Sequence, residues 1–150
     1  MVAASILPIT IYKNKLHFLF GKENPNEDSA PGWSDFGGRI EKGETPYQGA
    51  LREGAEELSG FLGNEIQLKK LIKKNGGPMK IRVENYHIYL FYLDYDESLI
   101  NYFNMNHYYM YNFMKKQQKK QEKLAFLDKI EIQWFSLEKM ENEKNKFRHF

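Results

Sequence analysis

The segment from Thr45 to Ser59 constrains the fold more than any other part of this sequence. Thr45 is a favourable N-cap and Pro46 suits the first helical position, so the segment predicts an α-helix. Because successive helical residues are rotated by about 100°, three glutamates fall within an arc of about 100° on one side. These are Glu53, Glu56 and Glu57, while Leu51, Ala55 and Leu58 gather on the opposite side. We expect the apolar side to dock on a sheet and the carboxylates to converge.

Three carboxylates on one helix face repel one another, which costs stability unless a cation lies among them. Hard divalent cations, Mg²⁺ or Mn²⁺, prefer such oxygen ligands. The chain has no cysteine, so carboxylates are its main candidate metal ligands. A solvated acidic helix face is the competing interpretation.

The residues around this helix form a longer spaced pattern. Gly38 is followed, after gaps of five, seven and two residues, by Glu44, Arg52-Glu53 and Glu56-Glu57. This pattern resembles the Nudix box, and the chain is similar to the Nudix hydrolase superfamily. We refer to residues Gly38–Gly60 as the box.

Three box positions depart from the family pattern, which has an aliphatic residue at 54, glycine at 59 and an aliphatic residue at 60. Gly54 in mid-helix costs about 1 kcal/mol relative to alanine. Ser59 lacks the conformational freedom of glycine, and we expect Gly60 to supply a left-handed residue one position later. None of these departures removes a candidate ligand.

The resemblance implies the Nudix fold, an α/β domain in which a mixed β-sheet is sandwiched between helices (α/β/α), with residues 1–150 as a single domain. Alternating apolar residues and turn residues predict strands at the following places: 5–12, 16–20, 36–40, 66–73, 79–95 and 130–135. Residues 21–35 predict a loop, and a helical insert is expected near 97–124. Ser136 should cap a terminal helix that begins at Leu137.

The resemblance also implies a reaction: metal-dependent hydrolysis of a diphosphate linkage in an NTP, a dinucleoside polyphosphate or a nucleotide sugar. A diphosphate is negatively charged and repels an attacking water, so metal ions must neutralise it. The implied ligands of Mg²⁺ or Mn²⁺ are Glu53, Glu56, Glu57 and the carbonyl of Gly38. Arg52 would orient the glutamates, since Arg52 and Glu56 are neighbours on the helix surface. Glu44 would brace the loop or bind metal through water.

The general base is open between Glu53 and an acidic residue near the last strand. Asp128 matches that second place best, with Glu122 and Glu131 as alternatives. For each of these three residues, a surface carboxylate is the competing interpretation.

Candidate substrate contacts lie on both sides of the helix. Trp33 precedes the box and either stacks on a base or packs against the sheet. Arg39, Arg82 and Tyr86 are further candidates. His87 is alone in an apolar strand, where a core histidine is the more typical interpretation, and Trp134 and Phe135 are expected in the core.

Charge is unevenly distributed although the formal net charge is only +2. Residues 66–82 hold six basic residues and no acidic residue, and residues 101–123 hold five lysines and one glutamate. The second stretch also contains six tyrosines and phenylalanines. Basic residues interleaved with aromatic residues can hold RNA through phosphate contacts and base stacking. Alternatively, residues 101–123 form a helical insert with a buried aromatic face and a solvated lysine-rich face.

Two further functions therefore stay open. One is decapping of capped RNA; residues 33–38 and 146–150 are loosely similar to Nudix proteins of large DNA viruses, in which decapping is a known role. The other is a non-catalytic nucleotide sensor, whose usual signature is loss of a box glutamate, whereas all are present here. A homodimer is implied only by the family.

No apolar run approaches the roughly 18 residues that span a bilayer, so no membrane partner is expected. The absence of cysteine suits a reducing compartment, and we expect a cytoplasmic protein.

Overall fold

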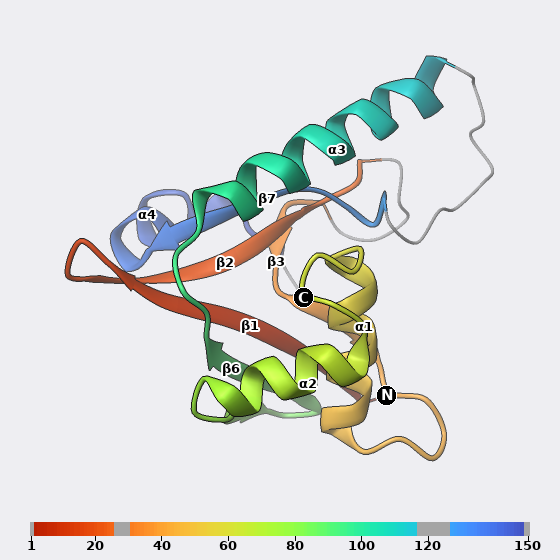
Figure 1. Ribbon diagram of the computed structural model, residues 1–150, viewed down its shortest axis with the longest axis vertical. Coiled ribbons are helices and arrows are strands. Elements are labelled where there is room, and N and C mark those ends of the chain that lie inside the picture. Colours follow the sequence, from red (N-terminus) through yellow and green to blue (C-terminus); the bar gives the residue numbers. More distant parts are fainter. Residues whose placement is uncertain (1, 26–30, 117–126, 149–150) are drawn as a thin grey trace.

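The computed structural model describes residues 2–25, 31–116 (only the backbone of 114–116) and 127–148, and it shows a mixed seven-stranded sheet with helices (Figure 1). The strands are β1 (Ala3–Tyr12), β2 (Lys15–Glu23), β3 (Trp33–Ser34), β4 (Phe36–Arg39), β5 (Met79–Val83), β6 (Tyr86–Tyr92) and β7 (Lys129–Ser136). The helices are α1 (Pro46–Glu57), α2 (Glu65–Lys74), α3 (Glu97–Lys116) and α4 (Leu137–Asn142), followed by a 3₁₀ turn at Lys144–Lys146.

The sheet is organised around β1 and β2. Its main order is β3-β2-β1-β6-β5; β4 also pairs with β1, and β7 also pairs with β2. The β1–β6 pair is parallel and the other described pairs are antiparallel. Lys13 and Asn14 join β1 to β2 with φ of 51° and 62°, a pair of positive values that matches the right-handed twist of a hairpin.

Side chains alternate between the two faces of the sheet and build two apolar clusters. Ala4 and Ile6 of β1 face the larger cluster, which contains residues of α1, α2 and α3. Leu7 of β1 faces the smaller cluster, which includes Met140 of α4. The predicted α/β arrangement, a mixed sheet with helices on both faces, is therefore confirmed.

The strand predicted at 66–73 is wrong, because this segment is helix α2. Asn64 and Gln67 form a reciprocal capping box, with hydrogen bonds of 2.9 and 3.0 Å, that starts a helix. The apolar residues Leu68, Leu71 and Ile72 then recur at helical spacing, with Leu68 and Ile72 fully buried. The lysines of this segment are exposed on the other side of α2.

The single strand predicted at 79–95 is also wrong in its extent. It is divided into β5 and β6 by a turn in which Glu84 has a φ of 53°. The loop predicted at 21–35 instead contains the end of β2 and the short strand β3. Thr45 and Ser136 cap α1 and α4 as expected.

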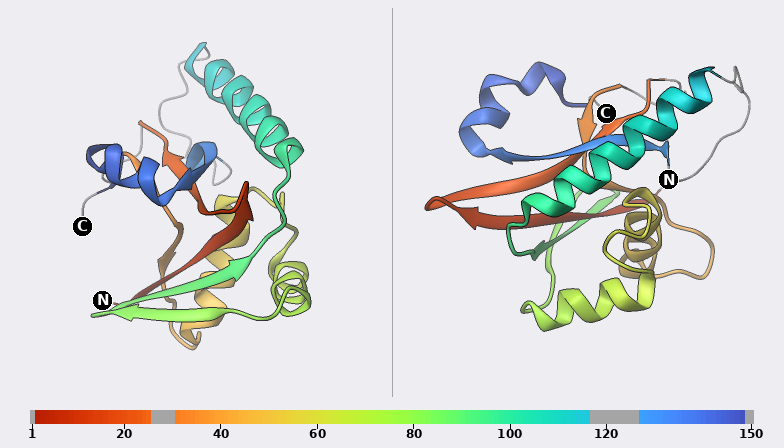
Figure 2. Two further views of the ribbon diagram at one scale, coloured as in Figure 1. Left: turned by 90° about the vertical axis from the view of Figure 1, so that its left-hand side faces the viewer. Right: turned by 45° about the horizontal axis from the view of Figure 1, so that its top comes forward.

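The insert predicted at 97–124 begins as the 20-residue helix α3; residues 117–124 lie outside the described residues. Helix α3 packs against β7, and its C-terminal end extends past the sheet (Figure 2). Of the helices in the described ranges, not one combines the length and the hydropathy needed to cross a membrane.

Candidate active site

Helix α1 lies unusually close to β1 because residue 54 has no side chain. A Cβ at Gly54 would lie 2.5 Å from Cδ1 and Cγ1 of Ile6. The side chain of Ile6 thus fills the space that an aliphatic residue at 54 would occupy. This contact explains the first departure from the family pattern, and it fixes the depth at which the glutamates of α1 meet the sheet.

We call Glu53, Glu56 and Glu57 of α1 the carboxylate row, with Glu53 and Glu56 at its outer end and Glu57 at its inner end. Arg52 holds Glu53 at the outer end. Its guanidinium donates to both oxygens of Glu44 at 2.8 and 3.0 Å, and to Oε1 of Glu53 at 2.8 Å. A third hydrogen bond, of 3.1 Å, reaches the carbonyl of Arg39. Arg52 is therefore bound to Glu53 and to the loop before α1, whereas the neighbour expected on the helix surface was Glu56.

Glu53 packs directly on the backbone of β4. A Cβ at Gly38 would lie 2.7 Å from Cδ of Glu53 and 2.8 Å from its Oε2. Glycine at position 38 therefore leaves the space that this carboxylate occupies, and it brings carboxylate oxygens to the β4 main chain.

Glu57 is held at the inner end of the row. Its Oε2 accepts a 2.9 Å hydrogen bond from the amide of Gly37 and lies 3.8 Å from Nζ of Lys129. Burial raises the pKa of Glu57 to about 8, against the opposing effect of Lys129. The carboxyl group is thus almost withdrawn from solvent, with a cation beside it.

Lys129 is the most deeply buried charged residue at the site, with only 1% of its surface exposed. Its ammonium donates to Oε1 of Glu23 at 2.7 Å and to Oγ of Ser34 at 2.5 Å. The lysine stem crosses Gly21, where a Cβ would lie 2.9 Å from Cδ of Lys129. We call Lys129, Glu23, Ser34 and Glu57 the Lys129 cluster.

Glu56 belongs to the outer end and is exposed. Its partial burial and the charge of Glu53 raise its pKa, so repulsion between these two carboxylates is not fully relieved by Arg52. Hard carboxylate oxygens that repel each other fit a divalent cation. Within the described ranges, no group of three or more His, Cys, Asp or Glu side chains is arranged to hold a metal ion.

The candidate bases occupy different surroundings. Asp128 is half-buried, and its charge contributes to the raised pKa of Glu57, which places it within electrostatic range of the row. Glu131 accepts a hydrogen bond from the hydroxyl of Tyr108 on α3. Glu122 lies outside the described residues.

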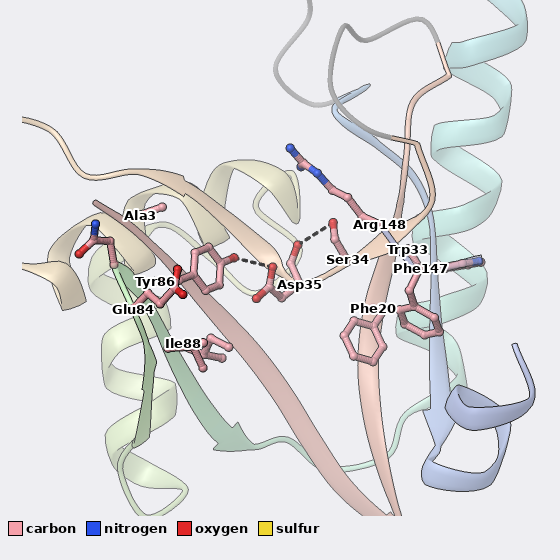
Figure 3. A pocket seen from close by; sticks show the side chains of 12 residues that line it. Ala3, Phe20, Trp33, Ser34, Asp35, Glu84, Tyr86, Ile88, Phe147 and Arg148 are labelled. Atoms are coloured by element: carbon pink, nitrogen blue, oxygen red, sulfur yellow. Dashed lines mark hydrogen bonds between the residues drawn. The ribbon is translucent and has the colours of Figure 1, made fainter. Parts of the chain in front are cut away.

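A pocket of about 560 Å³ lies on the face of the sheet opposite α1 (Figure 3). Aromatic side chains supply much of its wall: Phe20, Trp33, Tyr86 and Phe147. Asp35 lies within it and accepts hydrogen bonds from Tyr86 at 2.7 Å and from Ser5 at 2.6 Å. Burial, together with the charge of Asp35, raises the pKa of Tyr86, so its hydroxyl stays protonated as a donor.

Ser34 and Arg148 connect this pocket to the Lys129 cluster. Both line the pocket, and both hydrogen-bond to Oε1 of Glu23, at 3.0 Å and 3.2 Å. One wall of the pocket is therefore continuous, through Glu23 and Lys129, with the carboxyl group of Glu57.

The structure brings together only some of the predicted substrate contacts. Trp33 and Tyr86 share the pocket, and Trp33 also packs edge-on against Phe135 at a ring distance of 5.0 Å. Arg39 is exposed at the end of β4, and Arg82 is exposed on β5, where its Nε donates to the carbonyl of Glu84. Neither arginine is among the residues that line the pocket.

His87 alternates with Tyr86 on β6 and is buried on the α1 side of the sheet. Burial lowers its pKa, and the charges of Lys80 and Arg82 lower it further. Trp134 and Phe135 are buried, as expected for core residues.

After the C-terminal end of α1, Gly60 is left-handed as expected, but it is not the first residue with this conformation. Ser59 itself takes a left-handed conformation, with a φ of 54°, and Gly60 follows with 75°. The Ser59 hydroxyl lies 2.7 Å from Nε2 of His107, a fully buried residue of α3 that stacks on Phe103 at 3.7 Å. The second departure from the family pattern thus ties the helical insert to α1.

Four residues of the site were missed by sequence reasoning: Glu23, Asp35, Lys129 and Arg148. Asp35 is two residues after Trp33 and could have been found from that neighbourhood. The others carry no spacing signal, since Lys129 and Glu23 are 106 positions apart in the chain.

Comparison with known proteins agrees with this architecture. The family model described as NUDIX domain matches residues 1–150. A bifunctional NMN adenylyltransferase/ADP ribose pyrophosphatase from Francisella tularensis, complexed with AMP and a Mn ion, has a TM-score of 0.56 at 20% identity, over 98% of this chain and 37% of that one. The NUDIX domain of Shewanella oneidensis NrtR, complexed with ADP ribose, gives 0.52 at 12% identity, over 95% and 76%.

An Ap4A hydrolase of C. elegans, in a binary complex, gives a TM-score of 0.51 at 15% identity, over 95% of this chain and 86% of that one. At these identities the likeness is one of fold. No curated protein matches the chain in sequence. The family match extends over the whole sequence and includes the box, and on that ground the chain belongs to the Nudix family of hydrolases.

Proposed function

We propose that this protein hydrolyses a diphosphate linkage in a nucleoside diphosphate derivative, with Mg²⁺ or Mn²⁺ bound at the carboxylates of α1. The observation that carries the proposal is the continuity between an aromatic pocket and the carboxylate row, through Ser34, Glu23 and Lys129. Nucleotide chemistry recurs in the names of the structural neighbours, which include an Ap4A hydrolase and an ADP ribose pyrophosphatase.

Glu53 and Glu56 are the proposed metal ligands of the outer end of the row, with the carbonyl of Gly38 as a further ligand. The family pattern adds Glu57, the inner carboxylate. Once bound, the cation would neutralise the diphosphate and lower the pKa of a coordinated water. Arg52 positions Glu53 through its hydrogen bond and anchors the preceding loop through Glu44.

Asp128 is the proposed general base, with Glu53 as the alternative. Asp128 precedes β7 and lies within electrostatic range of Glu57, so its carboxylate is near the row without belonging to α1. A base on a separate element can accept a proton from an attacking water while the glutamates of α1 hold the cation.

The pocket would hold the nucleoside. Trp33 and Tyr86 offer aromatic surface for a base, and Asp35 offers a carboxylate acceptor for an exocyclic amino group. Arg39 and Arg82 lie outside the pocket and would contact only a substrate that extends beyond it.

The test is a substrate panel with Mg²⁺ or Mn²⁺: NTPs, Ap4A, ADP-ribose and capped RNA. Glu56→Gln should lower kcat by about 10² or more, because it removes direct charge stabilisation. Glu138→Gln, an exposed glutamate on α4, is the matched control and should leave kcat unchanged. No turnover of any substrate by the unaltered protein would favour a nucleotide sensor, and a Glu56→Gln rate within twofold would contradict the metal assignment.

Capped RNA is a second candidate substrate, favoured by one observation on α3. Tyr102 and Tyr109 are 66 and 69% exposed on this helix, whereas an insert with a purely structural role would bury its aromatic side chains. Exposed aromatic rings can stack on the bases of single-stranded RNA. The lysines beyond 116 in the basic stretch lie outside the described residues.

The KM of the Tyr109→Ala variant for capped RNA tests this second candidate. Under the RNA hypothesis, the KM for capped RNA rises at least fivefold while turnover of a free nucleotide is unchanged. Tyr92→Ala replaces an exposed tyrosine away from α3 and is the matched control. If the unaltered protein, Tyr109→Ala and Tyr92→Ala have the same KM for capped RNA, the RNA hypothesis is contradicted and a small nucleotide is the substrate class.

A further inference from the structure

The carboxylate row of α1 already contains one cation that belongs to the chain. Nζ of Lys129 lies 3.8 Å from Oε2 of Glu57 and 2.7 Å from Oε1 of Glu23. The lysine is 1% exposed, and Glu57 and Glu23 are 8% and 6% exposed. The ammonium group is therefore enclosed together with the carboxylates that it faces.

The surroundings of Lys129 fix the ammonium in this place. Ser34 accepts one of its hydrogen bonds, and the ring of Phe36 lies 5.8 Å from Nζ. The absence of a side chain at Gly21 makes room for the lysine stem. Because Lys129 is almost fully buried, its stem cannot rotate freely into solvent.

The outer end of the row has a different composition. Glu56 is exposed, and the ion pairs of Arg52 go to Glu53, Glu44 and Glu41. An oxygen of Glu56 can thus be approached from solvent. A divalent cation placed at this end meets two carboxylates, whereas a divalent cation placed beside Glu57 meets the Lys129 ammonium at close range.

We propose that Lys129 takes the place of a metal ion at the inner end of the row, so that Glu57 pairs with this ammonium and the free enzyme binds one divalent cation, at Glu53 and Glu56. Lys129 is then a positioning residue, since it holds Glu57 and Glu23. This inference rests on the proposed metal-dependent function, and it changes that proposal by removing Glu57 from the ligand set.

Mn²⁺ binding to the nucleotide-free protein tests the inference without any measurement of activity. Calorimetric titration of the unaltered chain should give one Mn²⁺ per chain. Glu56→Gln should weaken this binding at least tenfold, whereas Glu57→Gln should leave the Kd within twofold. Lys129→Met keeps the apolar stem and should allow a second Mn²⁺ to bind, while Lys129→Arg keeps a cation and should give one.

Two results would overturn the inference: two Mn²⁺ per unaltered chain with one lost in Glu57→Gln, or an unchanged stoichiometry in folded Lys129→Met. If Lys129→Met does not fold by circular dichroism, the comparison of Glu57→Gln with Glu56→Gln decides the question alone. Failure of the proposed function has a different signature, because the unaltered chain would then bind no Mn²⁺ and Glu56→Gln would change nothing.

Discussion

The two ends of the carboxylate row are held by different kinds of cation. At the outer end, Arg52 belongs to the same helix as Glu53 and pairs with Glu44, eight residues away, at the surface of the loop before α1. At the inner end, Lys129 comes from β7 and is almost fully buried against Glu23 and Glu57. The first pairing is local and partly solvated, and the second is remote and enclosed.

The difference between the two ends matters because burial changes what an ion pair contributes. A partly exposed arginine that donates two hydrogen bonds to one carboxylate mainly fixes geometry. A buried lysine mainly offsets the desolvation cost of carboxylates that the fold has enclosed, so removing it leaves those charges without compensation. We therefore expect Lys129 to matter most for stability and Arg52 to matter most for the position of Glu53.

The largest expected effect is the loss of stability on removing Lys129. Lys129→Met should lower the free energy of unfolding at pH 7 by about 3 kcal/mol, because Glu23 loses a buried partner. Arg52→Met should lower it by about 1 kcal/mol, since Arg52 and Glu44 are partly solvated. Urea denaturation of both variants measures the difference. Equal losses would remove the distinction between the two ends.

The second effect is a pH dependence at the inner end. Folding raises the pKa of Glu57 from 4.5 to about 8, through burial and the charges of Glu23 and Asp128 and against the charge of Lys129. Between these values the folded state binds more protons than the unfolded state, so stability should fall as the pH rises, by up to about 1.4 kcal/mol per pH unit.

This fall should be absent in Glu57→Gln when unfolding is measured in EDTA from pH 5 to 8. Glu44 at the outer end provides the opposite case, because its hydrogen bond from Arg52 lowers its pKa. Glu44 therefore contributes stability above pH 4.5 that is lost as the pH falls further. Glu44→Gln should lack this contribution at neutral pH, and its stability should approach that of the unaltered protein as the pH falls below 4.5. If the free energies of unfolding of the unaltered protein and Glu57→Gln depend on pH in the same way, burial does not raise the pKa of Glu57 as proposed.

The same contrast explains what the sequence could predict. Helix α1 and its Thr45 cap depend on neighbouring residues, so the local sequence predicted them. The spacing of Glu44, Arg52 and Glu53 matched the family pattern, although Arg52 was expected beside Glu56 and contacts Glu44 and Glu53 instead. The inner end depends on the side chain of Lys129 packing over Gly21 of the neighbouring strand β2. No local sequence pattern indicates a contact between such distant segments. A buried lysine also contradicts the usual expectation that lysine is exposed.

The wrong prediction at 66–73 has another cause. This segment alternates apolar and basic residues closely enough to resemble a strand, but the Asn64 and Gln67 capping box and the Leu68–Ile72 spacing favour a helix. The sequence of this segment therefore contains the information for a helix, because its buried residues follow the helical period of about 3.6 and not the strand period of 2. Ser59, like Lys129, could not be predicted from local sequence. Its left-handed conformation is accompanied by a contact with His107, 48 positions away.

The third effect tests whether the outer end fixes geometry. Arg52→Lys keeps the charge but cannot donate to both oxygens of Glu44 and to Glu53 together. We expect kcat to fall about tenfold with little change in stability, because Glu53 is left less well positioned. Steady-state kinetics on the best substrate of the panel measures kcat, and thermal unfolding is the control. A stability loss without a kcat change would assign Arg52 a structural role alone.

The smallest expected effect concerns the contact between Ser59, which follows α1, and His107 of α3. Ser59→Ala removes the hydroxyl beside Nε2 of His107 and leaves that ring nitrogen buried, which should cost about 1 kcal/mol of unfolding free energy. Ser59→Gly also removes the hydroxyl, but it relieves the left-handed backbone at φ 54°, so it should cost less than Ser59→Ala. Urea denaturation measures both variants. If Ser59→Gly is less stable than Ser59→Ala, the left-handed backbone at residue 59 is not strained and this explanation of the difference is wrong.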